Sequence, residues 1–159
     1  MKSDRARPVD TLKPRLRTKI AQTDEERAAH FAIRREVFVD EQKLFEETDL
    51  DEHDKDAIPI ICTVDDAIGG TVRVYPLKGA IWVGGRLAVR KAYRTYLVGP
   101  LLVKKAVKTV KERGCTQFLA HIQPQNVRFF QRLGWRITGE ELEISGVMHA
   151  VMEADLGRT

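Results

Sequence analysis

The sequence predicts one α/β (α+β) domain with a mixed, mostly antiparallel central sheet of about seven strands, flanked by about four helices. Three observations predict this class. Short β-prone runs recur along the chain, and several neighbouring runs are joined by two-residue turn signals, which favours hairpins. Residues 82–114 read as strand, tight turn and capped helix, which is typical of a β-α unit. No internal repeat or linker divides the chain.

Length and composition point to an ordinary globular protein. The chain has 159 residues, of which 43% are hydrophobic and 31% charged. No apolar run approaches the roughly 20 residues that span a bilayer, and no apolar segment follows the N-terminal charges as in a signal peptide. The two cysteines, Cys62 and Cys115, are far apart in sequence and lack metal-ligand spacing. We therefore expect a cytoplasmic protein with reduced thiols, no metal and no membrane partner.

The net charge of +4 is divided unevenly along the chain. Residues 1–19 contain seven basic and two acidic residues, whereas residues 40–56 contain nine acidic and two basic ones. We expect residues 1–12 to form a flexible basic arm and residues 13–159 to form the domain. The basic segment has no interleaved aromatic residues and no nucleic-acid-binding motif, so no nucleic-acid partner is predicted.

The first elements are a strand and a capped helix. Residues 15–20 alternate weakly and predict a strand. Thr23 and Glu26 have the spacing of a capping box, which predicts that a helix begins here and runs to about residue 37. Residues 38–45 predict a second short helix. Three residues at steps of four are expected to form the buried stripe of the first helix: Ala29, Ile33 and Val37.

The acidic segment over residues 46–56 predicts a loop. We expect its carboxylates to be solvated, although they could instead attract a cationic acceptor such as a polyamine, an aminoglycoside or a lysine. Asp49, Asp51 and Asp54 alternate as in a cation-binding loop, but no glycine stands where an EF-hand needs one, so calcium is not predicted.

The middle of the chain predicts a hairpin and a central strand. Residues 59–64 and 67–75 are β-prone and are separated by Asp65-Asp66 at the turn. Residues 82–89 form the next strand, and Gly84-Gly85 suits a bulge that would separate this strand from its neighbour.

A helix over about residues 100–113 follows the central strand. Gly99 is predicted as its N-cap, Pro100 as its first residue and Gly114 as the left-handed residue after its end. Its apolar residues recur at steps of three and four and predict one buried face: Leu102, Val103, Ala106, Val107 and Val110.

The C-terminal part predicts three more strands and one helix. Residues 117–122 are almost all apolar, which indicates an interior strand. A helix is expected over residues 126–133. Residues 135–144 and 147–156 predict two last strands, with Ser145-Gly146 as their turn.

Three stretches together resemble the GNAT superfamily of acetyl-coenzyme-A-dependent N-acyltransferases. Residues 87–99, which include Arg94-Thr95-Tyr96-Leu97-Val98-Gly99, resemble its coenzyme A signature, Arg/Gln-x-x-Gly-x-Gly/Ala. Residues 126–135 are similar to its second motif, Asn followed by Tyr-Glu-Lys-Leu-Gly-Phe. Residues 35–42 resemble the Arg-x-x-Val-Phe-x-x-Glu-Gln helix of one branch. The three motifs occur in the expected order on the expected elements.

The resemblance implies an enzyme that transfers an acetyl group from acetyl-CoA directly to an amine of a small molecule or protein, with no metal. Backbone N–H groups after the central strand would bind the pyrophosphate, because small residues there let the backbone approach closely. The Leu87 backbone N–H would polarise the thioester carbonyl, and such a donor typically contributes about 2.7–4 kcal/mol. The cofactor-binding residues implied are Leu87, Ala88, Val89, Arg94, Thr95, Tyr96, Leu97, Val98, Gly99, Asn126 and Phe130.

The sequence departs from the superfamily pattern at three positions. Leu97 replaces the first glycine of the signature, and Pro100 has no N–H to donate. Phe130 replaces the tyrosine that usually protonates the leaving thiolate; Tyr96 and Tyr75 are possible substitutes without positional support. A thiolate with a pKa near about 8.5 can also leave without full protonation.

The general base has three candidates. The acceptor amine must lose a proton before it attacks, and residues 82–89 offer no Glu or Asp at the position that many relatives use. Glu41 follows the first helix, and His121 stands on the fifth strand with a suitable pKa. Against these roles, Glu41 could be a surface carboxylate and His121 a hydrogen-bonded core residue. His149 on the last strand ranks third.

Two alternative functions remain open. Leu97 and Phe130 favour a non-catalytic acyl-CoA-binding or regulatory domain. The first helix, with its Arg-x-x-x-Phe pattern, is also similar to that of longer-chain N-acyl amino acid or homoserine-lactone-type synthases. The protein could also form a homodimer.

Overall fold

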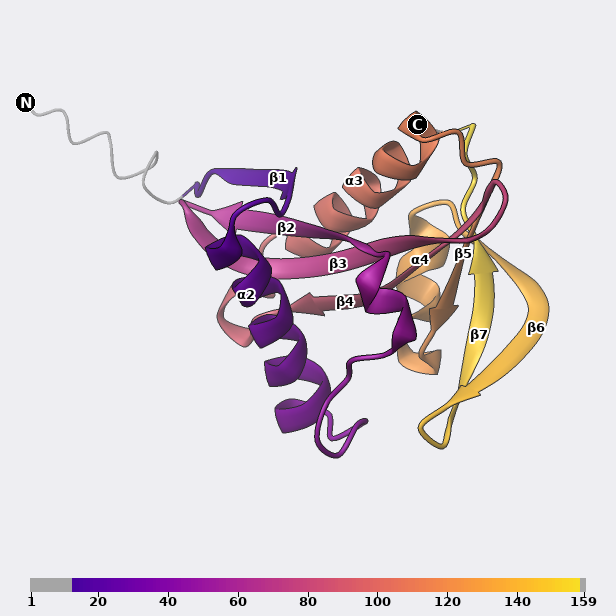
Figure 1. Ribbon diagram of the computed structural model, residues 1–159, viewed down its shortest axis with the longest axis horizontal. Helices are drawn as coiled ribbons and strands as arrows, with labels where there is room; N and C mark the ends of the chain where they lie inside the picture. The colour runs from indigo at the N-terminus through magenta and orange to yellow at the C-terminus, as the bar shows by residue number, and fades with distance from the viewer. Residues whose placement is uncertain (1–12, 158–159) are drawn as a thin grey trace, which may run out of the picture.

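A seven-stranded sheet forms the centre of the structure, a computed structural model that describes residues 13–157 (Figure 1). The predicted arm of residues 1–12 lies outside the described residues. The strand order is β1-β2-β3-β4-β5-β7-β6, and every neighbouring pair is antiparallel except β4 and β5. The strands are β1 Leu16–Ile20, β2 Ile58–Val64, β3 Ala67–Lys78, β4 Ile81–Val89, β5 Gln117–Ile122, β6 Arg136–Ile144 and β7 Val147–Glu153. The predicted fold class is confirmed.

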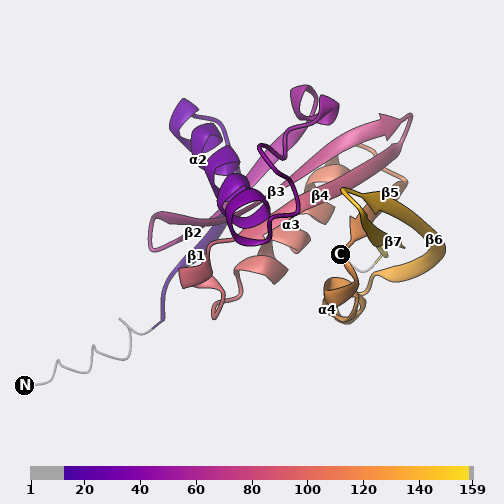
Figure 2. The same cartoon turned by 90° about the horizontal axis from the view of Figure 1, so that it is seen from below.

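Helices cover both faces of this sheet. Helix α2, Asp24–Arg34, lies on one face, and α3, Val98–Glu112, and α4, Val127–Arg132, lie on the other (Figure 2). Among residues 13–157 these are the three α-helices, one fewer than expected. The predicted second helix is instead a π-helical continuation of α2 over Arg35–Glu41. Its Val37, Phe38 and Val39 are buried, so tertiary packing keeps the chain helical where a break was expected.

The start of α2 is as predicted, but its buried face is wider. Thr23 accepts a hydrogen bond from the N–H of Glu26, whose side chain accepts one from the Thr23 N–H, which confirms the capping box. Ala29 is only half-buried, whereas His30 and Arg34 are buried together with Ile33. The face of α2 that contacts the sheet therefore includes two polar side chains, His30 and Arg34, beside the apolar Ile33.

Helix α3 begins two residues earlier than the sequence predicted. Leu97, not Gly99, is its N-cap, and Val98 is its first residue, so Pro100 stands third. The physical reason is packing: a Cβ added to Gly70 on β3 would lie 2.6 Å from Val98 Cγ1, so Val98 is pressed against the sheet. Gly114 follows the end of the helix with φ +82°, as predicted. The five predicted apolar residues are all buried.

Both predicted two-residue turns are confirmed by their backbone conformation. Asp65 and Asp66 have φ of 50° and 75°, and Ser145 and Gly146 have φ of 50° and 81°. Two successive residues with positive φ form the turn type that matches the twist of antiparallel hairpins.

Both cysteines lie in the interior of the fold. Cys62 and Cys115 are free thiols, and burial raises the pKa of each. No helix in residues 13–157 is long and apolar enough to cross a membrane.

Candidate functional site

The two central parallel strands separate after only four residue pairs. Strand β4 pairs with β5 from Ile81 to Gly84, and residues 85–89 of β4 have no partner on β5. Gly84 permits the last close contact, because a Cβ there would lie 2.8 Å from Phe118 Cζ on β5. Beyond this point the backbone edge of β4 is free to pair with something other than protein.

A bulge in β4 lies at the same level, two residues later than predicted. Thr71 of β3 pairs with Ala88 and Arg73 with Gly85, so Arg86 and Leu87 together oppose one residue of β3. Arg86 has φ +54°, an uncommon conformation for a residue other than glycine. The prediction of a bulge at Gly84-Gly85 is therefore wrong. The bulge turns Arg86 toward the face that carries α2, where its guanidinium meets Asp49.

A cavity of about 120 Å³ occupies the opening between β4 and β5. It has two chemically different sides. The side toward α3 and α4 is apolar and includes Val103, Ala106, Phe118, Phe130 and Trp135. The side toward α2 is polar and includes Arg73, Tyr75, Arg86, His121 and His149. Leu87 and Asn126, both predicted site residues, also line the cavity.

Phe130 forms part of the apolar wall. Its ring packs edge to face on Phe129, with 5.1 Å between centroids, and on Trp135 at 5.4 Å. The side chain is 7% exposed. The position of the usual tyrosine is therefore in the cavity wall but offers no proton.

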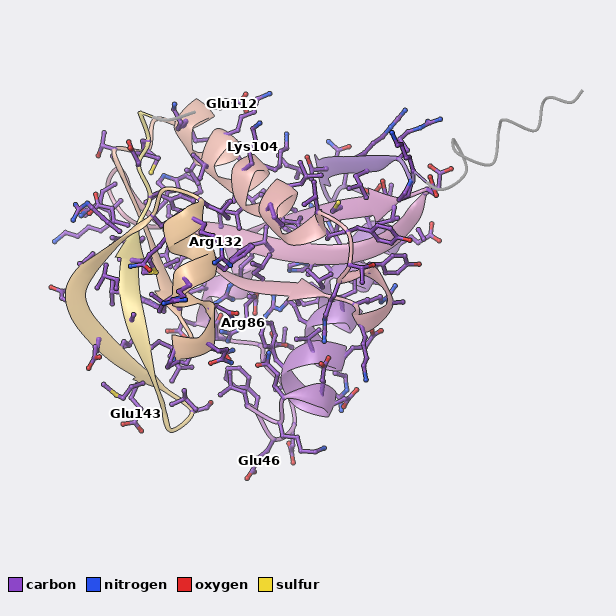
Figure 3. All side chains as sticks on the ribbon, turned by 180° about the vertical axis from the view of Figure 1, so that it is seen from behind. Glu46, Arg86, Lys104, Glu112, Arg132 and Glu143 are labelled. Carbon is purple, nitrogen blue, oxygen red and sulfur yellow. The ribbon has the colours of Figure 1, made fainter. Side chains whose placement is uncertain are left out.

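A second cavity of about 300 Å³ adjoins the first between α3 and α4. Val103 and Trp135 line both cavities. Its rim carries two basic residues, Lys104 on α3 and Arg132 on α4, which lie on the same side of the molecule (Figure 3). Leu97 also lines it and is 65% exposed.

Free backbone donors gather at the turn before α3. The N–H groups of Thr95 and Leu97 donate to no backbone carbonyl in the described part of the chain. The N–H groups of Val98 and Gly99 belong to the first helical turn, which leaves them without intrahelical acceptors. Four of the predicted cofactor-binding residues thus present unpaired N–H donors. Pro100 adds no N–H to this group, and the Leu97 side chain restricts how closely a ligand can approach the backbone.

Glu41 and Arg94 form an ion pair with each other and do not line the cavity. Arg94 donates to both carboxylate oxygens of Glu41, at 2.6 and 2.5 Å, and its Nε donates to the Val89 carbonyl at 2.9 Å. The hydrogen bonds from Arg94 lower the pKa of Glu41. Neither side chain lines the cavity, and Tyr96 is exposed outside it. Glu41, Arg94 and Tyr96 are therefore among the predicted site residues that do not line the opening.

His121 lies at the opening itself. It follows Ala120, the last β5 residue that pairs with β4, and its ring lines the cavity. Its ring makes no hydrogen bond within residues 13–157, so it is not the hydrogen-bonded core histidine that was the alternative. Burial, with smaller contributions from His149 and His53, lowers the pKa of His121, which keeps its ring neutral at pH 7.

Two further polar groups complete this side of the cavity. His149 Nδ1 donates to the Val147 carbonyl at 2.9 Å, which leaves Nε2 as the acceptor nitrogen of the neutral ring. The Tyr75 ring stacks on His53 with 4.1 Å between centroids, and burial raises the pKa of the Tyr75 hydroxyl. Of the two tyrosines considered as proton donors, only Tyr75 lines the cavity.

Three aspartates of the acidic segment, Asp49, Asp51 and Asp54, form an ion network behind the cavity, whereas its other acidic residues are exposed as expected: Glu46, Glu47, Glu52 and Asp56. Arg34 of α2 has no exposed surface. Its Nε donates to Asp49 Oδ2 at 2.7 Å, and its Nη1 and Nη2 donate to the two carboxylate oxygens of Asp54 at 2.7 and 3.0 Å. A short 3-10 helix over Glu52–Lys55 holds Asp54 in place.

Two arginines from the sheet complete the network. Arg73 Nη1 and Nη2 donate to the two carboxylate oxygens of Asp51 at 2.6 and 2.7 Å, and Nη1 also reaches Asp54 at 2.9 Å. Arg86 donates to Asp49 at 3.1 Å and to Asp51 at 3.3 Å. Three arginines therefore face three aspartates. Burial raises the pKa of Asp51 and Asp54, but the neighbouring arginines outweigh burial and lower both.

His30 extends this network toward the core. Its Nδ1 donates to the Thr71 hydroxyl, which donates to the Ile60 carbonyl at 2.7 Å, and its Nε2 accepts from Arg34 at 3.1 Å. Only the neutral ring fits this arrangement. Burial, reinforced by Arg34, lowers the pKa of His30 to about 3.

The stability of the protein should therefore fall in mild acid. The unfolded chain binds a proton at His30 below pH 6.5, whereas the folded chain binds none until about pH 3, so folding is favoured above pH 6.5 and weakens as the pH falls. We expect a loss of about 1.4 kcal/mol per pH unit below pH 6.5 from this residue. Urea unfolding at pH 7.5 and 5, and its repetition with His30→Gln, measures the effect. If the free energy of unfolding falls as much between pH 7.5 and 5 in His30→Gln as in the parent protein, another residue causes the acid sensitivity. His121, whose pKa is also lowered, contributes in the same direction.

Sequence reasoning missed Arg34, Arg73 and Arg86 as site residues. The alternation of Asp49, Asp51 and Asp54 was a signal of a shared partner, but nothing in the sequence pairs them with arginines from other elements. The positive φ of Arg86 depends on the bulge, which has no glycine to mark it.

The comparisons with known proteins fit this geometry. Residues 20–156 match the family described as "Acetyltransferase (GNAT) domain". A Bacillus subtilis protein provisionally named an acetyltransferase is 33% identical over 125 residues, which are 77% of this chain and 84% of that protein. A Lactobacillus plantarum structure provisionally assigned as an N-acetyltransferase has 26% identity and a TM-score of 0.79, and the match covers 89% of this chain and 98% of that one. The N-acyl amino acid synthase FeeM, from uncultured soil microbes, shares the fold with 14% identity and a TM-score of 0.72, over 91% and 92% of the two chains.

Proposed function

Because the chain belongs to the GNAT acetyltransferase family, we propose that it transfers an acetyl group from acetyl-CoA directly to the amine of an acceptor. The observation that carries this proposal is the opening between β4 and β5, with the free β4 edge on one side and His121 on the other. Acetyl-CoA supplies an activated acetyl group as a thioester.

The residues present fit a coenzyme A ligand. The unpaired edge of β4 over residues 85–89 can receive the pantetheine arm as an added strand, with the Leu87 N–H toward the thioester carbonyl. The free N–H groups at the turn before α3 suit the pyrophosphate. Lys104 and Arg132 at the second cavity can bind another phosphate group of coenzyme A.

The polar side of the cavity supports the acceptor half of the reaction. His121 removes a proton from the acceptor ammonium, and the freed nitrogen lone pair forms the new C–N bond. The C–S bond breaks, and the CoA sulfur leaves with the electron pair. The second proton lost by the nitrogen restores the thiol, directly or through water, so that one proton is released overall. Phe130 has no proton to donate in this transfer. Tyr75 carries a hydroxyl group in the cavity wall that can donate one.

Two other functions are less well supported. A domain that binds acyl-CoA without turnover would explain Phe130, but it gives no role to the unpartnered His121 ring. A longer-chain synthase is supported by fold alone, because the synthase FeeM has 14% identity. Comparing the turnover rates of acetyl-, hexanoyl- and dodecanoyl-CoA shows which acyl-chain length the protein uses.

Blocking the opening tests the proposal. A Cβ added to Gly85 meets no atom within 4 Å, so Gly85→Val should fold normally while its side chain enters the cavity. Thiol release from acetyl-CoA with a panel of amines is expected in the parent protein and should fall at least about tenfold in this variant, the equivalent of about 1.4 kcal/mol. The free energy of unfolding should change by less than about 0.5 kcal/mol.

Leu77→Val is the matched control, since Leu77 is an exposed β3 residue outside the cavity. Acetyl-CoA binding without any thiol release would favour the non-catalytic function. Equal release by the parent and the Gly85→Val variant would move the reaction away from this cavity.

A further inference from the structure

We propose that the acceptor is an amine that also bears a carboxylate, as an amino acid does, and that Arg86 together with Arg73 binds this carboxylate in the cavity. The inference rests on the proposed function, because it names the substrate class of the same site. It argues against the alternative left open by the sequence, in which the acidic segment attracts a cationic acceptor.

The first support is the charge of the cavity wall. No aspartate or glutamate is among the described residues that line it, whereas Arg73 and Arg86 both do. A polyamine or aminoglycoside would place several ammonium groups beside two guanidinium groups, which is unfavourable. An acceptor with one amine and one carboxylate brings a partner for the arginines.

The second support is that the acidic segment has no free charge to offer at this point. Asp49, Asp51 and Asp54 are each bound to at least two arginines. They lie behind the arginines as seen from the cavity, because they are absent from its lining. Their effect is to fix the two guanidinium groups in place, as a preorganised anion site requires.

The third support is that each of the two arginines retains an unused donor. Arg73 is 3% exposed, and its Nε is buried without any hydrogen-bond partner. Arg86 uses Nε and Nη2 toward Asp49 and Asp51, while Nη1 has no partner within residues 13–157. A buried donor without a partner is unfavourable, so a ligand oxygen that accepts from it would be bound strongly.

The fourth support is the placement of Arg86 relative to His121. Arg86 stands on β4 and His121 on β5, one on each side of the opening, and both line the same cavity. In the view of Figure 3, Arg86 is labelled between α4 and the segment that carries Glu46. The guanidinium also packs over the Phe45 ring at 4.7 Å, which restricts its movement. A small molecule held by its carboxylate at Arg86 can therefore present its amine to the neutral ring of His121.

The test compares amines that differ only in the carboxylate. Common L-amino acids and the corresponding L-amino acid amides are offered with acetyl-CoA, and spermidine is included as a polycation. We expect kcat/KM for the acids to exceed that for the amides by at least about tenfold, since a charge-assisted hydrogen bond is lost in the amide. Spermidine should be the poorest acceptor. A preference for the amides or for spermidine would overturn the inference while leaving acetyl transfer itself established.

Variants of Arg86 test where the carboxylate binds. Arg86→Gln should bring the preference for acids close to unity and raise KM for the acceptor, while acetyl-CoA affinity is unchanged. Arg86→Lys keeps the charge and should retain part of the preference. Arg90→Gln is the matched control, because Arg90 lies at the end of β4 in an exposed pair with Glu36. A full preference in a folded Arg86→Gln variant would contradict the assignment.

A binding measurement separates this inference from the proposed function. The Nε–H resonances of Arg73 and Arg86 are followed by NMR as the same amino acids and amides are added at millimolar concentration. Shifts with the acids alone support the carboxylate site even if no acetyl transfer is detected. No shift with any acid, or equal shifts with the amides, would overturn the inference whatever the outcome of the transfer assay.

Discussion

Replacing Arg34 with methionine is expected to lower the free energy of unfolding by about 3–5 kcal/mol. Arg34 has no exposed surface, and it binds Asp49 and Asp54 through its guanidinium nitrogens at distances of 2.7 to 3.0 Å. Its loss leaves Asp49, itself 3% exposed, with only part of its hydrogen bonding. Removing one partner of a buried pair is costly because the other charge stays in a poorly solvated place.

Urea unfolding of the variant measures this loss. Arg90→Met is the matched control: Arg90 pairs with Glu36 at the surface at 3.1 Å, and such pairs contribute about 1 kcal/mol or less. Combining Arg34→Met with Asp49→Asn should recover part of the stability, because Arg73 and Arg86 then face two carboxylates and no negative charge is left in excess. Equal losses for Arg34→Met and Arg90→Met would show that the network does not stabilise the fold as argued.

Replacing His121 with alanine is expected to lower kcat by about 10²- to 10⁴-fold, the usual contribution of a general base. Affinity for acetyl-CoA should be unchanged, because His121 lies on the polar side of the cavity and not at the turn before α3. The pH profile gives a second readout. Burial and the neighbouring histidines hold the pKa of His121 below 6.5, and only the neutral ring accepts a proton. The rate should therefore rise as the pH increases through that pKa, and this limb should disappear in His121→Ala.

Glu41→Gln is the informative comparison for this prediction. Its carboxylate is bound at both oxygens by Arg94 and lies outside the cavity, so we expect kcat close to that of the parent protein. His149→Ala should have a smaller effect than His121→Ala, since His149 Nδ1 is already bound to the Val147 carbonyl. A large loss in Glu41→Gln together with full activity in His121→Ala would exchange the two roles.

Most of the fold could be predicted because its signals are local. The capping box at Thr23, the turns at Asp65-Asp66 and Ser145-Gly146, and Gly114 each specify a backbone geometry that neighbouring residues alone determine. The errors arose where distant packing decides. Val98 begins α3 because it is pressed against Gly70, and the chain after Arg34 stays helical because its apolar residues are buried against the sheet.

The sequence marks the turn before α3 and His121, but not the arginines of the candidate site. That turn belongs to a continuous stretch after β4, so a motif in the sequence marks it. The ion network beside the cavity brings together Arg34, Arg73 and Arg86 with three aspartates from a separate segment. No spacing rule connects these residues, and Arg86 faces the others only because a bulge without a glycine reverses its direction. Asp49, Asp51 and Asp54, which looked solvated in the sequence, are therefore internal partners of the arginines.

A crystal structure of the protein with acetyl-CoA tests the central claim most directly. We predict that the pantetheine arm lies along residues 85–89 of β4, with the thioester carbonyl within hydrogen-bond distance of the Leu87 N–H and its acetyl group facing His121 across the cavity. Coenzyme A bound elsewhere, or a β4–β5 opening that closes on its own side chains and excludes the thioester, would contradict the account.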